Sequence, residues 1–202
     1  MRVLRASTEA EMVAVFLRTE LSSDRFGAEV RALMERDGVP ERVVTAPDLR
    51  DDAENESRLG LLTGHRGYGD RTDYFAGFPE DVRWHWMAMT PADLDAVRFI
   101  DYSYWNELSG GSRLAVDAVP RIRAGVEPFG VPGGRLLRLA GEFAAGGRFP
   151  PLIVVTTGPG GAMVVLEGHV RLSAFMLARD HLPREMEVLV GSSASMTRWD
   201  CW

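Results

Sequence analysis

The chain has 202 residues, of which 46% are hydrophobic and 26% are charged, so it can bury a sizeable core as one domain or as two small ones. Its formal net charge of −6 gives no overall attraction to nucleic acid, and it has no apolar run of about eighteen residues, the length that a membrane span needs. The single cysteine, Cys201, excludes an internal disulfide and a multi-cysteine metal site, and we expect a cytoplasmic protein that binds neither nucleic acid nor membranes.

Helical patterns dominate the first part of the chain. Thr8 followed by Glu11 is a capping-box pattern, which marks the start of an amphipathic helix. Gly64 is expected to close a later helix, because glycine commonly follows the last helical residue. In chain order, the patterns predict a strand at residues 2–5, helices at 8–21 and 26–37, a strand at 42–45 and a helix at 52–63.

A group of basic and aromatic residues follows, with glycines between some of them. Aromatic rings can stack on a nucleobase and arginines can pair with anions, so the group has the composition of a ligand pocket. The simpler interpretation, which we favour, places the tryptophans in the core and the arginines on the surface. If both halves of the chain form one site, Arg66→Ala should weaken ligand binding without unfolding the protein. The group consists of Arg58, His65, Arg66, Tyr68, Trp84, His85 and Trp86.

Glycines near residue 110 suggest a domain boundary. Before it, the alternation of Trp84 and Trp86 predicts a strand at 82–89, and Thr90 followed by Pro91 starts a helix that we expect to continue towards Tyr102. The tail from residue 192 to 202 has no readable pattern, although its two tryptophans should dock on the protein. Beyond the boundary we predict helices at 113–125 and 135–145 and a last strand at 186–190.

Residues 151–181 form the most informative stretch. Two short apolar runs, 152–156 and 162–166, are separated by turn residues and followed by a helical pattern, so they predict strand, turn, strand and helix. The turn, Gly158-Pro159-Gly160-Gly161, resembles a phosphate-binding loop. It lacks the lysine and the Ser/Thr of a Walker motif, so we interpret it as a hairpin turn.

The corner between the second strand and the helix is the candidate binding site. Gly168 leaves the first helical N–H groups open, and Arg171 lies in the first turn, so a phosphate would meet both a helix dipole and a guanidinium. His169 can donate a hydrogen bond to phosphate. Glu167 can bind Mg²⁺ or a ribose hydroxyl, or it can act only as a helix cap. The alternative is a plain turn with a solvated arginine.

Residues 164–174, preceded by residues 149–155, resemble the core of the ParB/sulfiredoxin-like domain, in which a Gly-x-x-Arg corner handles phosphates. The resemblance covers roughly the last ninety residues and implies nucleotide binding. By analogy with kinases of this superfamily, Glu127 is the candidate base, with Glu142 as its rival. Sulfiredoxin activity is not expected, because that reaction needs a cysteine at the corner and Cys201 lies elsewhere.

We therefore expect an α+β protein with a mainly helical region at 1–110, of unassigned role, and a ParB/sulfiredoxin-like α/β domain at 111–202. In the leading hypothesis it is a small-molecule kinase. Gly168, His169 and Arg171 bind ATP or a related nucleotide, Mg²⁺ neutralises the phosphates, and Glu127 activates a hydroxyl-bearing acceptor. The alternatives are a non-catalytic nucleotide-responsive binding module and a ParB-like nuclease, although no cluster of carboxylates and histidines with two-metal spacing supports the nuclease.

Overall fold

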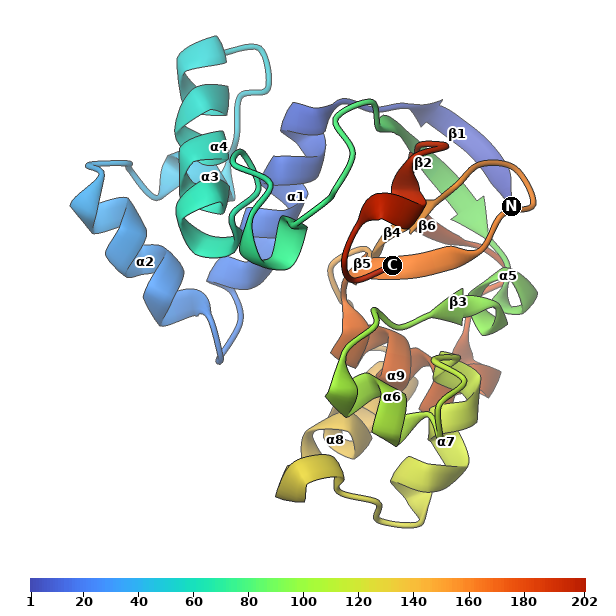
Figure 1. The fold of residues 1–202 in the computed structure, drawn as a ribbon. Helices are drawn as coiled ribbons and strands as arrows, with labels where there is room; N and C mark the ends of the chain where they lie inside the picture. Colours follow the sequence, from blue (N-terminus) through green and yellow to red (C-terminus); the bar gives the residue numbers. More distant parts are fainter.

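The computed structural model describes residues 1–202 and shows a mixed α/β protein with nine α-helices around one six-stranded sheet (Figure 1). The strand order is β1-β2-β6-β4-β5-β3. β1–β2, β2–β6 and β4–β5 are antiparallel, whereas β4–β6 and β3–β5 are parallel. The strands are β1 (Arg2–Ala6), β2 (Arg83–Met89), β3 (Val97–Arg98), β4 (Ile153–Thr156), β5 (Met163–Glu167) and β6 (Met186–Ser192).

Helices cover both faces of the sheet, and Figure 1 shows the two groups on different sides of it. The first group is α1 (Glu9–Leu21), α2 (Gly27–Arg36), α3 (Arg42–Thr45) and α4 (Asp52–Arg66). The second group is α6 (Ser103–Leu108), α7 (Ala115–Arg123), α8 (Gly134–Ala144) and α9 (His169–Leu177), and α5 (Pro91–Asp95) connects β2 to β3. None of these helices has both the length and the apolar character that a membrane span requires.

The central strands are buried on both faces, which is why their sequences read as continuous apolar runs. Successive side chains of a strand point to opposite faces. In β5, Val164 and Leu166 pack in the core beneath α1–α4, whereas Val165 packs in the core beneath α6–α9. Their partners in β4 follow the same rule, because Val155 pairs with Val164 and Val154 with Val165.

The sheet takes strands from both sides of the boundary expected near residue 110. β2 pairs with β6 along its whole length, and β3 pairs with β5. The N-terminal half therefore contributes three of the six strands as well as the α1–α4 layer. The expected boundary does not separate two sheets.

Most predicted elements are confirmed, but one is of the wrong kind and two end at other residues than expected. Residues 42–45 form helix α3 instead of a strand, because Pro40 and Glu41 accept the first hydrogen bonds of a helical turn. α4 continues past Gly64 to Arg66 and ends at Gly67, whose φ of 75° requires glycine. The helix expected from residue 90 to 102 stops at Asp95, because Val97 and Arg98 leave it to pair with β5.

The tail docks on the sheet and on the α1–α4 layer. Met196–Arg198 forms a short 3₁₀ turn (η4), and the buried Trp199 donates its indole N–H to the carbonyl oxygen of Tyr74 at 2.7 Å. Trp202 is half-buried. The prediction that the tail tryptophans dock is confirmed, although the sequence did not indicate their partners.

Candidate functional site

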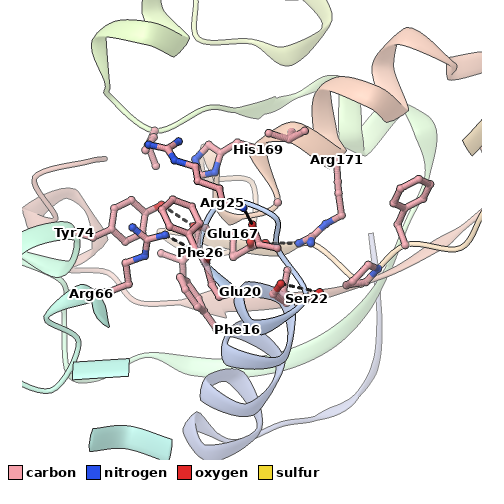
Figure 2. Close-up of a pocket in the computed structure, with 18 of the residues that line it drawn as sticks. Phe16, Glu20, Ser22, Arg25, Phe26, Arg66, Tyr74, Glu167, His169 and Arg171 are labelled. Carbon is pink, nitrogen blue, oxygen red and sulfur yellow. Dashed lines mark hydrogen bonds and ion pairs between the residues drawn. The ribbon is translucent and has the colours of Figure 1, made fainter. Parts of the chain in front are cut away.

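A cavity of about 490 Å³ lies between the α1–α4 layer and the end of β5, where α9 begins. Figure 2 shows side chains of α1 and α4 facing those of the β5–α9 corner. Its aromatic and aliphatic lining includes Phe16, Phe26, Tyr74, Ile100, Trp105, Phe149 and Leu166. Its charged lining is Glu20, Arg25, Arg66, Arg135, Glu167 and Arg171, so both halves of the chain contribute.

The β5–α9 corner depends on Gly168, which precedes the first residue of α9 with a φ of 107°. A Cβ at this position would lie 2.5 Å from Leu152 Cδ2 and 2.8 Å from Arg171 Nη2. Only glycine therefore fits. Because Gly168 has no side chain to cap the helix, the first N–H groups of α9 have no side-chain acceptor. The positive end of the helix dipole is thus open at the cavity.

Arg171, in the first turn of α9, forms an ion pair with Glu167, the last residue of β5, and their side chains are 11% and 15% exposed. The same guanidinium nitrogen, Nη2, also donates to the carbonyl oxygen of Pro151 at 3.2 Å. Burial raises the pKa of Glu167 above its usual value, and the charge of Arg171 only partly opposes this. Glu167 therefore accepts a proton more readily than an exposed carboxylate does.

His169 is held in an aromatic stack at the start of α9. Its ring lies nearly parallel to Trp105, with centroids 5.3 Å apart, and Trp105 stacks on Phe99 at 4.5 Å. Burial lowers the pKa of His169 to about 3, and the charges of Arg171 and Arg66 contribute. The ring is therefore neutral at pH 7 and can offer a phosphate one N–H donor but no charge. In the free protein, its Nε2 has no hydrogen-bond partner.

The opposite wall is built around Arg66, the last residue of α4. Its Nη2 donates to Glu20 Oε1 at 2.8 Å, and its guanidinium carbon lies 4.0 Å from the centre of the Phe26 ring. Burial favours the protonated form of Glu20, but His65 and Arg66 outweigh it, so the pKa of Glu20 lies below its usual value and it remains a carboxylate. The Tyr74 hydroxyl donates to the carbonyl oxygen of Leu166 at 2.6 Å, which ties this wall to β5.

The structure brings most of the predicted site residues together. Glu167, Gly168, His169 and Arg171 all line the cavity. Glu127 does not: it is exposed, directly before the short 3₁₀ helix η2 (Pro128–Gly130), and lies outside the cavity lining. Glu142, its rival, also lies outside the cavity lining, where it forms an exposed ion pair with Arg138. The loop at residues 158–161 connects β4 to β5, as expected of a hairpin turn.

Of the basic and aromatic group in the first half, only Arg66 lines the cavity. Trp84 and Trp86 are buried in the core, as expected. Arg58 is not on the surface, because its side chain is 0% exposed.

Sequence reasoning missed Glu20, Arg25 and Arg135. Glu20 carried a usable signal: it follows Phe16 and Leu17 at helical spacing, so it lies on the apolar side of α1. A glutamate at such a position is rarely buried without a partner. Arg25 and Arg135 carried no such signal, because nothing local distinguishes them from solvated arginines.

The cavity does not contain the ligand set of a preformed metal centre. No group of three or more His, Cys, Asp or Glu side chains is placed to hold an ion. Glu20 and Glu167 are the carboxylates of the lining, so a Mg²⁺ ion there would need phosphate oxygens to complete its shell. Cys201 lies outside the lining, and burial raises the pKa of its thiol.

No protein-family model matches the chain, and comparisons with curated proteins and with solved structures also give no match.

Proposed function

We propose that the cavity binds a nucleotide by its phosphates. One observation carries the proposal: the uncapped start of α9 opens into a cavity that four arginines also line. Unpaired helical N–H groups, a helix dipole and guanidinium groups each favour an anion, and phosphate uses all three. The expected resemblance to the ParB/sulfiredoxin-like domain agrees with this ligand and remains a prediction.

The remainder of the lining suits the nucleoside part of such a ligand. Phe26, Tyr74 and Trp105 offer aromatic surface, and Phe16, Ile100 and Leu166 offer apolar surface. The volume of about 490 Å³ falls within the range typical of small-molecule sites. A base stacked on this surface would place its phosphates near the charged groups of the corner.

We further propose phosphoryl transfer to a small hydroxyl-bearing acceptor, and the environment of Glu167 favours it. One of its carboxylate oxygens pairs with Arg171, the other has no hydrogen bond in the protein, and its raised pKa suits a base. In this reaction the acceptor hydroxyl attacks the terminal phosphorus and gives its proton to Glu167. The bond from that phosphorus to the bridging oxygen breaks, and the nucleoside diphosphate leaves. Glu127 has no part in this scheme, because it lies outside the cavity.

The binding proposal is tested by thermal unfolding with ATP, ADP, CTP and GTP, with and without Mg²⁺. A ligand that binds only the folded state raises the melting temperature. We expect at least one nucleotide to do so in the wild type and not in Arg171→Ala. Arg179→Ala is the matched control, because Arg179 also pairs with a carboxylate, Asp95, but lies outside the cavity.

No rise with any nucleotide at millimolar concentration would overturn nucleotide binding. Phosphoryl transfer is tested separately, by nucleotide turnover in the presence of hydroxyl-bearing acceptors. Glu167→Gln should abolish turnover, because an amide cannot take the proton. Binding without turnover, in the wild type and with every acceptor, would favour a non-catalytic nucleotide-responsive module instead.

A further inference from the structure

The four arginines of the cavity fall into two kinds. Arg66 pairs with Glu20, and Arg171 pairs with Glu167. Arg25 and Arg135 have no carboxylate within 4.0 Å, and their guanidinium groups donate no hydrogen bond within the chain. The paired arginines are neutralised, so the cavity retains the positive charge of the other two.

The unpaired arginines come from two different walls of the cavity. Arg25 is exposed in the loop between α1 and α2, where its guanidinium carbon lies 4.7 Å from the centre of the Phe26 ring. Arg135 is half-buried in the first turn of α8, so it belongs to a different wall. Phe16, Ile100 and Leu166 are buried and form the inner surface. The cavity thus combines an apolar floor with two unpaired positive charges on separate walls.

The position of the two unpaired arginines matters more than their lack of a carboxylate partner. Exposed arginines elsewhere are of both kinds: Arg2 pairs with Glu185, whereas Arg50 has no carboxylate partner. Arg25 and Arg135 differ from such arginines because both line one cavity. Two unpaired cations that line the same concave surface raise its local potential and attract an anion.

We infer that Arg25 and Arg135 bind the outer phosphates of a nucleoside di- or triphosphate. The inference rests on the proposed function and gives the ligand a direction in the cavity. The base lies on the apolar floor, the inner phosphate meets the start of α9, and the outer phosphates lie between Arg171 and the two unpaired arginines, where the terminal phosphate stays within reach of Glu167. The site should therefore prefer nucleoside triphosphates and diphosphates to monophosphates.

The test compares affinities for mono-, di- and triphosphates of adenosine, guanosine and cytidine by isothermal titration calorimetry. Arg25→Gln and Arg135→Gln should each weaken binding of a triphosphate roughly tenfold, because each removes charge-assisted hydrogen bonds, and should change binding of the monophosphate less than about twofold. The double variant should lose the preference for the triphosphate. Arg138→Gln is the matched control, because Arg138 lies on the same helix but pairs with Glu142 outside the cavity.

The outcomes separate this inference from the proposed function. The inference would be overturned if Arg25→Gln and Arg135→Gln lost the same affinity for monophosphates as for triphosphates. It would also be overturned if they bound triphosphates as tightly as Arg138→Gln does. Either result would leave nucleotide binding intact. If no nucleotide binds, tripolyphosphate and orthophosphate serve as probes in the same variants. Tripolyphosphate binding that depends on Arg25 and Arg135 would support the anion site without the nucleoside, and no binding of either probe would overturn both proposals.

Discussion

Arg58 and Arg66 lie two turns apart on α4, yet their surroundings differ completely. Arg58 is 0% exposed and donates to the carbonyl oxygens of Val43 at 2.8 Å and Asp48 at 3.0 Å. It also contacts Glu54, at 3.5 Å. Arg66 is 22% exposed, donates to one carboxylate, and turns its remaining N–H groups to the cavity.

The difference shows how to tell a structural arginine from one that binds a ligand. Arg58 donates through both terminal nitrogens to backbone carbonyl oxygens and to the side chain of Asn55, and so fixes α3 and the following loop against α4. Arg66 keeps donors without a protein partner, which is the arrangement that a ligand requires. Burial alone would have pointed to Arg58, and Arg58 also has one donor, Nε, without a partner. Free donors together with a place in the cavity lining point to Arg66.

The largest effect should come from Arg58→Met, which removes the buried guanidinium and leaves carbonyl acceptors without a donor. We expect the free energy of unfolding to fall by about 3–5 kcal/mol, measured by urea denaturation. The folded variant should still bind nucleotide, so nucleotide should still raise its melting temperature. Arg50→Met, at an exposed position in the neighbouring loop, is the control. A loss below about 1 kcal/mol would mean that Arg58 does not hold this region together.

Gly168→Ala should act on both stability and binding. The new Cβ meets Leu152 and Arg171, and the left-handed backbone is strained, so we expect a loss of about 2–3 kcal/mol and no nucleotide-induced rise in melting temperature. Gly158→Ala is the matched control: its φ is also positive, at 134°, but a Cβ added there would meet no atom within 4 Å. It should cost about 1 kcal/mol and leave binding unchanged. Equal binding in both variants would count against the corner as the phosphate site.

The half-buried, neutral His169 predicts a pH dependence of stability. Its pKa is about 3 in the folded protein and about 6.5 in the unfolded chain, so between these values the unfolded chain binds the extra proton. Stability should therefore fall as the pH drops below 6.5, by about 2 kcal/mol at pH 5. His169→Phe, which keeps the stack on Trp105, should remove this loss, and replacement of the exposed His181 is the control. An identical pH profile in His169→Phe and the wild type would contradict the burial argument.

The sequence alone was enough to predict features that depend on residues close to one another in the chain. The β4–turn–β5–α9 stretch was predictable, because apolar runs, turn glycines and helical spacing lie within one segment. Residues 42–45 were misleading: two consecutive valines favour a strand, but a proline nearby starts a helical turn. The helix after Thr90 was overestimated because pairing of β3 with β5 depends on a strand that follows much later in the chain.

The site was predictable only in part for the same reason. The corner residues from Glu167 to Arg171 are consecutive, so their convergence followed from the turn itself. Glu20, Arg25 and Arg135 reach the cavity because two helical layers pack on opposite faces of one sheet, and no local pattern encodes that packing. The analogy that points to Glu127 spans a loosely matched segment, and the structure places this residue outside the lining.

The smallest expected effect, Arg66→Ala, is the sharpest test of the comparison. We expect nucleotide affinity to fall roughly tenfold, about 1.4 kcal/mol, with a loss of stability of about 1 kcal/mol because Glu20 loses a partner. Adding Glu20→Gln removes the unpaired charge and should restore stability but not affinity, which separates the two effects. Arg36→Ala, which breaks an exposed pair with Asp37, is the control. Unchanged affinity in Arg66→Ala would remove the α1–α4 layer from the site and leave Arg66, like Arg58, a structural residue.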